Sequence, residues 1–430
     1  MNAAPVAIVG GGVAGLACAL HLYEAGAAVR VFEASDRVGG RVRTDRVDGF
    51  QIDRGFQVLS TAYPEVQALV DLPALKLGAF LPGARVRVGG AFADVIDPLR
   101  HPRELTRLFG SPVMPLADQL RVGALRQHTT RGSLEALYER PEQSALQRLR
   151  ARGFSERAIE HFFRPFFAGV FLERDLASSS RFLEFAFRHF ALGEATLPAE
   201  GMEAIPRQLA ARLPDGAIRV NAPVESIESG GVRVAGERFE TSAVVIATDG
   251  ESARSFLPTL PALRHNATTC LSFAAERDPV GAPLLVLDAE GSGPVNHVCV
   301  PSAVAPSYAP AGSALVSASV IGVPSASDAE LARDACAQLR GWFGVEVDAW
   351  RLLRVDRIAH ALPQQLVGAL QPVEREVRFG PRLFACGDHR DMGSLHGALR
   401  SGRRAAEAVC TALGLAREPA ALFPRRRAAP

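Results

Sequence analysis

A glycine-rich loop follows the first apolar segment of the chain. Val6–Val9 predicts a buried strand before the loop, and Ala17–Ala25 predicts a helix behind it. In such a loop the first glycine permits a tight turn, the second lets a pyrophosphate approach the backbone, and the third lets the helix pack on the strand. The free N-terminus of the helix also attracts phosphate. The sequence therefore predicts a dinucleotide-binding loop made of Gly10, Gly12, Val13, Ala14 and Gly15.

An acidic residue stands where the second strand of such a unit ends. Val29–Phe32 predicts that strand, and Glu33 follows it, 18 residues after Gly15. A carboxylate at this distance is placed to accept hydrogen bonds from the ribose of a dinucleotide. Strand, loop, helix, strand and acid together predict a Rossmann-like unit.

A second run extends this unit. Glu33 is followed by Arg37, by the pair Gly39-Gly40 and by Arg41. The two glycines let the chain pass close to a ligand, and the Arg41 guanidinium offers a planar set of donors to phosphate. This run resembles the fingerprint of the flavin amine oxidase superfamily, which includes monoamine and polyamine oxidases, protoporphyrinogen oxidase and carotenoid desaturases. The resemblance implies FAD as the cofactor, with Arg37, Gly40 and Arg41 at its pyrophosphate.

Later segments are similar to further motifs of the superfamily, in the same order along the chain. The resemblance implies that Gly55 and Phe56 lie near the isoalloxazine ring and that Val224 meets the adenine through its backbone. It also implies that Asp388, after Gly387, meets the ribityl–phosphate region. The segments that carry this resemblance are 49–56, 197–206, 222–227, 384–388 and 397–406.

Three distant regions predict parts of one α/β unit. Ala243–Ala247 and Leu383–Cys386 predict two more buried strands, and Ala398–Leu413 predicts a helix. Between them, residues 100–165 have helical spacing and residues 270–320 alternate as strands do. The expected fold class is α/β, with a Rossmann-like FAD-binding domain assembled from discontinuous segments and an α+β substrate domain inserted twice. The predicted FAD-binding segments are 1–75, 200–255 and 375–414, the substrate domain is 76–199 and 256–374, and 415–430 is a tail.

The sequence singles out no catalytic side chain, since flavin N5 accepts the hydride. Phe56 and His396 are candidates because the resemblance sets both beside the flavin, and His389, beside the same motif, is a second histidine of interest. An ordinary hydrogen-bonding role is the alternative for both histidines. The chain has one glycine loop of this type and no second nucleotide site. That favours an oxidase or desaturase whose flavin is reoxidised by oxygen or a quinone.

Residues that serve amine oxidation in the superfamily are missing here. Its amine oxidases use a lysine near flavin N5, in a strand that would match residues 267–273, but Lys76 is the only lysine of this chain. Phenylalanine is instead concentrated, with ten of the 23 between Phe154 and Phe190. These rings predict either a buried helical core or an apolar tunnel or membrane-facing entrance for a long substrate.

These features favour removal of hydride from an apolar substrate, by a carotenoid-type desaturase of carotenoid biosynthesis or a protoporphyrinogen-oxidase-like enzyme. Arg164–Phe171 resembles a stretch of both branches, and His360–Gln364 resembles one of the porphyrinogen branch. Against the first branch, Ser394–Gly397 replaces the His-Pro-Gly-Gly signature of phytoene desaturases. Two alternatives stay open: a flavin amine oxidase that releases hydrogen peroxide, and a non-catalytic flavin-binding protein.

Charge and composition argue against nucleic-acid-binding, metal-binding and membrane-spanning proteins. The net charge is +2 and basic residues form no stripe, which argues against nucleic acid as a partner, and Arg425–Arg427 predicts only a solvated charge run. Six scattered cysteines without a C-x-x-C pair argue for reduced thiols and against a metal site. No apolar run is long enough to span a membrane. We expect a cytoplasmic protein, with peripheral membrane contact as an open alternative.

Overall fold

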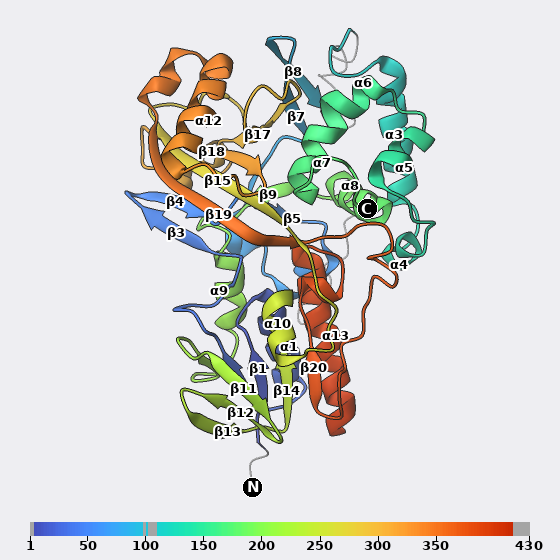
Figure 1. The fold of residues 1–430 in the computed structure, drawn as a ribbon, viewed down its shortest axis with the longest axis vertical. Coiled ribbons are helices and arrows are strands. Elements are labelled where there is room, and N and C mark those ends of the chain that lie inside the picture. Colours follow the sequence, from blue (N-terminus) through green and yellow to red (C-terminus); the bar gives the residue numbers. More distant parts are fainter. Residues whose placement is uncertain (1–3, 98–99, 102–109, 416–430) are drawn as a thin grey trace.

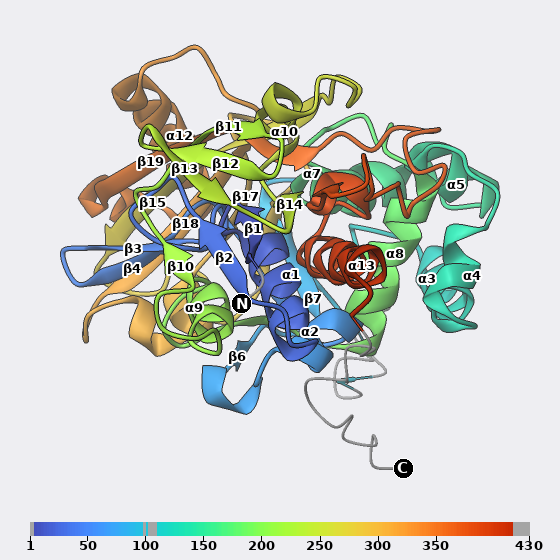
Figure 2. The same ribbon diagram turned by 90° about the horizontal axis from the view of Figure 1, so that it is seen from below.

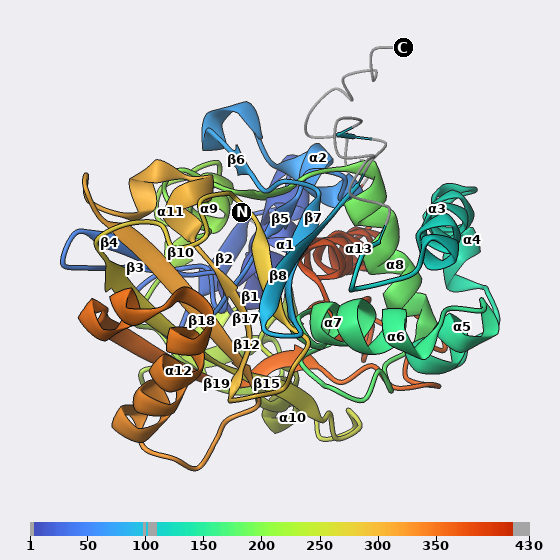
Figure 3. The same ribbon diagram turned by 90° about the horizontal axis from the view of Figure 1, so that it is seen from above.

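Two large β-sheets organise the chain, one in the lower and one in the upper part of Figure 1. The structure is a computed structural model that describes residues 4–97, 100–101 and 110–415. Helices α3 to α8 gather on one side of the molecule and α12 lies on the other, as Figures 2 and 3 show. The predicted α/β class is confirmed.

The lower sheet has five strands, and every neighbouring pair is parallel. β1 lies at its centre and is fully apolar and buried, as expected of a strand covered on both faces. The strand predictions are confirmed to within a residue or two at each end. In spatial order the strands are β10 (Ile218–Arg219), β2 (Val29–Phe32), β1 (Val6–Val9), β14 (Ala243–Ile246) and β20 (Leu383–Ala385).

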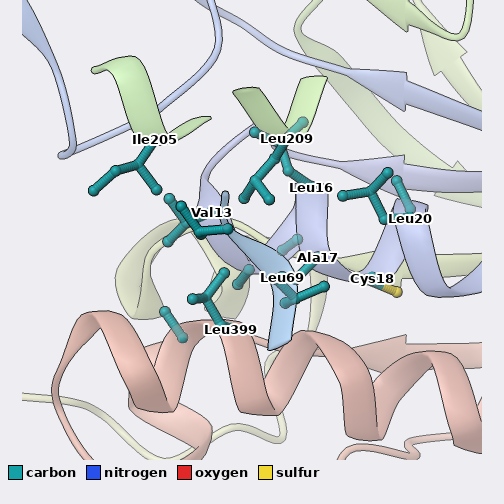
Figure 4. Close-up of a cluster of buried hydrophobic side chains, with 14 of the residues drawn as sticks. Val13, Leu16, Ala17, Cys18, Leu20, Leu69, Ile205, Leu209 and Leu399 are labelled. Atoms are coloured by element: carbon teal, nitrogen blue, oxygen red, sulfur yellow. The ribbon is translucent and has the colours of Figure 1, made fainter. Parts of the chain in front are cut away.

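The helix behind the glycine loop, α1 (Val13–Glu24), begins four residues before the predicted start. Gly12 has an extended backbone and ends the loop, so the helix starts at the next residue. α1 packs against α2 (Pro64–Leu69), α9 (Ala204–Ala210) and α13 (Leu395–Leu413). Figure 4 shows the side chains gathered there, among them Val13, Leu16, Ala17, Leu20, Leu69, Ile205, Leu209 and Leu399.

The last helix, α13, also begins earlier than predicted. Ser394 is its N-cap, and the Ser394 hydroxyl oxygen accepts a 3.0 Å hydrogen bond from the Gly397 N–H. Gly402 brings α13 against α1, since a Cβ at that position would lie 2.3 Å from the Ala14 carbonyl oxygen. The first and last helices of the fold are therefore in direct contact, and only glycine fits at their closest approach.

The upper sheet has seven strands. One face carries apolar residues such as Leu271, Val316 and Val298, which pack against α12 (Asp328–Phe343). The opposite face carries small polar residues and is described with the site below. In spatial order the strands are β19 (Arg351–Pro363), β15 (His265–Ala275), β18 (Ala314–Ile321), β17 (Val295–Cys299), β16 (Leu285–Asp288), β7 (Gly83–Val88) and β8 (Ala91–Ile96).

The helical region contains the phenylalanine cluster. Six of its ten rings are buried and belong to one core, which fits the core interpretation for them: Phe154, Phe163, Phe167, Phe171, Phe182 and Phe185. Phe162, Phe166, Phe187 and Phe190 are only partly buried. The helices are α3 (Leu116–Thr130), α4 (Leu134–Tyr138), α5 (Ala145–Ala151), α6 (Glu156–Ala158), α7 (Arg164–Phe171) and α8 (Ser180–Leu192). Residues 102–109 of the predicted helical stretch, and the tail with Arg425–Arg427, lie outside the described residues.

Three small sheets, the short helix α11 (Pro301–Val304) and one further short helix complete the described fold. An antiparallel sheet of β11 (Val224–Glu228), β12 (Gly231–Val234) and β13 (Glu237–Glu240) packs on the five-stranded sheet through Phe32 and Phe239. The others are β3 (Thr44–Val47) with β4 (Phe50–Asp53), and β5 (Leu59–Ser60) with β9 (Ala195–Leu197) and β6 (Gly78–Ala79); the further helix is α10 (Gly250–Phe256). The predicted domain boundaries stay a prediction. No described helix combines the length and apolar character needed to cross a bilayer.

Candidate active site

The glycine loop packs so tightly that two of its glycines cannot carry a side chain. A Cβ on Gly10 would lie 2.8 Å from the Ala247 carbonyl oxygen, and one on Gly15 would lie 2.1 Å from the Gly10 carbonyl oxygen. Gly12 differs, because no atom of the described residues lies within 4 Å of the place its Cβ would take. The N-cap residue of α1 is Gly12 itself, so no N-cap side chain occupies the first N–H groups of the helix. The loop thus presents open backbone and a free helix N-terminus, which suits a phosphate.

Glu33 is fixed at the end of β2 by both of its carboxylate oxygens. Oε2 accepts a 2.7 Å hydrogen bond from the Gly11 N–H, and Oε1 accepts hydrogen bonds from the Ser35 N–H at 2.9 Å and the Ser35 hydroxyl at 2.7 Å. The segment before Val224 joins the same place, since the Ala222 N–H donates to the Glu33 carbonyl oxygen at 2.9 Å. Val224 itself is half-buried at the start of β11. The structure therefore brings Val224 into the neighbourhood of Glu33.

Arg41 and Asp388 form an ion pair across 347 positions of sequence. The Arg41 Nη2 donates to the Asp388 carboxylate at 2.7 Å, and its Nη1 donates to the Ala361 carbonyl oxygen at 2.9 Å. Burial alone would raise the pKa of Asp388, but the Arg41 guanidinium more than offsets it, so the pKa lies below its usual value. The adjacent Gly387 N–H donates to the Ser401 hydroxyl at 2.9 Å. Two residues predicted to meet the same cofactor are thus in contact.

Gly40 and Arg37, two further residues of the predicted cofactor site, lie in different surroundings. Gly40 lies by the loop, since its Cβ would be 3.5 Å from the Gly12 Cα. Arg37 instead pairs with the Asp45 carboxylate and, at 3.2 Å, with the Glu203 carboxylate. Arg37 therefore ties its loop to the segment before α9.

Gly55 and Phe56 form a turn that faces the polar side of the upper sheet. Gly55 has a positive φ of 74° and packs against Ile358 and Thr268, so a side chain there would collide. A cavity of about 20 Å³, enough for roughly one water molecule, lies beside this turn. Its lining includes Phe56, Ser272, Tyr308 and Ser317. Of β15, Ser272 lines this cavity. Thr268, which lies near Gly55, and Cys270, which contacts the Ser317 hydroxyl, are on the same face of the strand, and all three residues are uncharged.

The candidate histidines are both buried and neutral. Burial lowers the pKa of His389 to about 4, and burial together with His189 lowers the pKa of His396 well below its ordinary value. The His396 ring is packed among Tyr63, Phe185 and His189, and its Nδ1 accepts a 3.4 Å hydrogen bond from the Glu65 N–H. A cationic acid role finds no support in these surroundings. Their catalytic involvement stays a prediction.

Asp53, just before the Gly55–Phe56 turn, was not among the predicted site residues. Its carboxylate accepts hydrogen bonds from the Thr44 hydroxyl at 2.5 Å, the Met202 N–H at 3.0 Å and the Tyr308 hydroxyl at 2.7 Å. Burial raises the pKa of Asp53 to about 6. An acid at the end of the alternating strand Phe50–Asp53 was the available signal, but its partners come from 149 and 255 positions away.

Comparison with known proteins identifies the family. The family described as flavin containing amine oxidoreductase matches residues 13–410. The chain belongs to this family. The prediction of an FAD-dependent oxidoreductase is thereby confirmed, together with its cofactor.

Individual members of the family align less completely. Protoporphyrinogen oxidase 2 of Arabidopsis thaliana is 47% identical over 66 residues, which cover 15% of this chain and 13% of that protein. Phytoene dehydrogenase of Streptomyces griseus is 31% identical over 279 residues, covering 57% of this chain and 54% of that protein. The chain therefore matches at most about half the length of these relatives, and neither alignment assigns their substrates to it.

A solved structure extends the likeness to the whole fold. Cyclohexylamine oxidase of Brevibacterium oxydans superposes with a TM-score of 0.70 over 96% of this chain and 100% of that chain, at 18% identity. This likeness concerns the fold alone, because one fold carries many activities.

The residues present fit the flavin cofactor of the family. The glycine loop leaves backbone open at Gly12, which as the N-cap of α1 places no side chain over the helix N-terminus. Arg41 adds a cation directly after Gly40, which lies by Gly12. These are the groups that a dinucleotide pyrophosphate requires. Glu33 supplies a fixed carboxylate at the end of β2, where a ribose needs an acceptor.

Proposed function

We propose that the protein is an FAD-dependent oxidoreductase that removes a hydride from an apolar substrate rather than from an amine. One observation carries this proposal: the face of β15 beside the Gly55–Phe56 turn bears Thr268, Cys270 and Ser272. The resemblance implies a lysine on this strand in amine oxidases. Lys76, the only lysine of the chain, is exposed and lies just before β6, not on β15. This wall therefore lacks the charged group of the amine-oxidising branch.

We further propose the residues that hold FAD. The pyrophosphate would be held by the loop and the first turn of α1, with Arg41, and the ribose by Glu33. Bound FAD supplies the hydride acceptor, while the chain binds and orients it. The proposed set is Gly10, Gly12, Val13, Ala14, Gly15, Glu33, Arg37, Gly40, Arg41, Gly55, Val224, Gly387 and Asp388. The Arg41–Asp388 pair supports it, because it joins two motifs predicted for one ligand.

Two substrate types fit the proposal. The relatives named for phytoene and for protoporphyrinogen suggest an isoprenoid or a porphyrinogen-like compound. The partly buried rings of Phe162, Phe166, Phe187 and Phe190 would supply apolar contact for either. Oxygen or a quinone would then reoxidise the flavin, since the sequence contains one glycine loop of this type.

Anaerobic reduction of the bound flavin tests this function directly. The purified yellow protein is mixed without oxygen with phytoene, with protoporphyrinogen IX, or with cyclohexylamine, and the visible flavin absorption is followed. We expect bleaching with phytoene or the porphyrinogen and none with the amine. Bleaching by the amine alone, with peroxide released on admission of air, would instead establish the amine oxidase alternative. Reoxidation by air or by a soluble quinone then identifies the acceptor.

Peripheral membrane contact is a separate proposal. Leu116 and Leu120 lie one turn apart on α3 and are 43% and 71% exposed. An apolar pair of this kind suits an interface where an apolar substrate would enter. Co-sedimentation with phosphatidylcholine vesicles, lost in Leu120→Glu but not in Val345→Glu at another exposed apolar position, would support it. Equal recovery of all three proteins in the supernatant would exclude it.

A further inference from the structure

A buried histidine stands behind the Gly55–Phe56 turn, on the upper sheet. His297 on β17 is 3% exposed, and its imidazole lies 5.2 Å from the Phe56 ring, centroid to centroid. α7 approaches it from the other side through Gly169, where a Cβ would be 3.0 Å from the imidazole Nδ1. A histidine at this place is enclosed by the turn, the sheet and the phenylalanine-rich helix.

A β-bulge turns this part of β17. Val295 pairs with Val320 but His297 pairs with Ser319, so Asn296 is an extra residue in the strand. A bulge re-aims the side chains of its strand, and bulges are common next to active sites. Here the Asn296 amide and the His297 imidazole reach one another at 3.1 Å, although they are neighbours in a strand.

The hydrogen bonds of Asn296 determine which imidazole nitrogen carries the proton. The Asn296 Nδ2 donates to the Pro165 carbonyl oxygen at 3.0 Å, and a carbonyl can only accept, so this amide nitrogen is correctly placed as the donor. The same Nδ2 meets the His297 Nδ1 and must donate to it. Nδ1 is therefore the acceptor, and the proton of the neutral imidazole sits on Nε2.

The Nε2–H group of His297 has no hydrogen-bond partner among the described residues. The nearby Phe56 ring is at best a weak acceptor. Burial lowers the pKa of His297 to about 4, so the ring is neutral at physiological pH and keeps this one donor. Buried donors are nearly always paired in folded proteins. An unpaired one beside a predicted flavin-facing turn is suited to an acceptor on a ligand.

We propose that the His297 Nε2–H binds a hydrogen-bond acceptor on the substrate and orients the substrate at the Phe56 turn. This inference rests on the proposed function and narrows it. The preferred substrate is then an apolar molecule that bears an oxygen or nitrogen acceptor, such as a porphyrinogen-like compound, and not a plain hydrocarbon. The same donor could meet an acceptor at the edge of the flavin, and the test separates the two sources.

Equilibrium binding of two probes tests the inference without turnover. Protoporphyrin IX, which bears two carboxylates, and the hydrocarbon phytoene are each equilibrated with the protein after its flavin has been chemically reduced without oxygen, so that neither probe can be oxidised, and the bound fraction is measured after gel filtration. We expect His297→Phe to weaken protoporphyrin IX binding about tenfold, the effect of one lost hydrogen bond, and to leave phytoene binding unchanged. His297→Gln, which keeps an N–H near the same place, should retain binding to within about threefold.

Two further variants test whether a change in probe binding is specific to the surroundings of His297 or reflects a general change in packing. His21→Phe replaces another buried histidine with unpaired nitrogens, on α1 near Arg212 and Arg403, and should leave probe binding unchanged. Gly169→Ala should weaken protoporphyrin IX binding in the same direction as His297→Phe, because its Cβ presses on the imidazole.

The outcomes are distinguishable from one another. Equal binding of protoporphyrin IX by the parent and His297→Phe would overturn the inference. A shifted flavin spectrum or potential in ligand-free His297→Phe, with unchanged probe binding, would assign the donor to the cofactor and also overturn it. Amine oxidation without flavin reduction by phytoene or porphyrinogen would refute the proposed function, and the binding comparison would still stand by itself.

Discussion

The two large sheets of the molecule contribute different chemical groups to the proposed site. The five-stranded sheet is apolar throughout its central strand and offers backbone: a glycine loop, an uncapped helix and tight contacts that exclude side chains. The seven-stranded sheet packs one apolar face on α12 and turns small polar side chains toward the Phe56 turn. In the proposed site, FAD is therefore met largely by backbone, with the side chains of Glu33 and Arg41, while the proposed substrate side depends on individual side chains.

The largest effect is expected at the contact between α1 and α13, where the two helices lie too close together to admit a side chain. In Gly402→Val the side chain would meet the Ala14 carbonyl oxygen, since even a Cβ would lie 2.3 Å away, and would force α13 from α1. We expect the free energy of unfolding to fall by more than about 3 kcal/mol and FAD to be lost. The flavin-to-protein absorbance ratio and thermal unfolding measure both. A stable variant with full FAD content would show that this contact does not position the loop.

A smaller effect is expected at the ion pair that joins two cofactor motifs. Asp388→Asn removes the negative charge that pairs with Arg41, so of these two contacts the arginine keeps only neutral acceptors, the Ala361 carbonyl oxygen and at most the new amide oxygen. We expect the free energy of unfolding to fall by about 2 kcal/mol. This is less than for a fully buried ion pair, because the Arg41 side chain is 39% exposed. FAD affinity, measured by titration of the apoprotein, should fall at least tenfold. If Arg41→Gln and the double variant lose no more than Asp388→Asn, the two residues act as one unit.

Asp53, between the two sheets, should leave a signature in the pH dependence of stability. Its pKa is raised from the usual value near 3.9 to about 6, so the folded state holds this proton more tightly than the unfolded chain. The free energy of unfolding must therefore fall, through this group, as pH rises from about 4 to about 6, and stay level above that. In Asp53→Asn this loss is absent, so the free energy of unfolding of the variant relative to the parent should rise by about 2–3 kcal/mol over that window. Urea unfolding at pH 4, 5, 6 and 7 measures the difference, and a constant difference would contradict the assignment.

The smallest effect belongs to a glycine outside both sites. Gly341 lies in α12, and a Cβ there would touch no described atom within 4 Å. Gly341→Ala should stabilise the protein by about 0.5–1 kcal/mol through helix propensity and leave FAD content unchanged. It is the matched control for Gly402→Val, since both add bulk within a helix. A loss of FAD in both variants would show that FAD content depends on how the protein was purified and not on the contact between α1 and α13.

The same contrast explains what the sequence could predict. The glycine loop, Glu33 and four of the five strands of the lower sheet were predictable, because each has a local residue pattern that backbone geometry dictates. The fifth strand, β10, is two residues long and was not predicted. The helix starts of α1 and α13 were placed three to four residues late, since a glycine or serine N-cap begins a helix before its apolar pattern is recognisable.

The substrate side was less predictable. His297 lies in an ordinary-looking strand, and its importance depends on a bulge, on Pro165 of a distant helix and on Phe56. Asp53 likewise needs Tyr308, 255 positions away, to show its role. Partners so far apart in sequence give no local pattern.

The contact between α1 and α13 has a consequence for how the protein is made. α1 leaves the ribosome well before α13, the helix that covers it, because Leu395–Leu413 follows Val13–Glu24 by several hundred residues. At ordinary rates of translation the interval is on the order of 20 to 80 s. During that time the flank of α1 that α13 covers stays open, and for most of it the sheet lacks its edge strand β20. A chain that lacks α13 would expose this part of the core, so the nascent protein should depend on chaperones until α13 has been made.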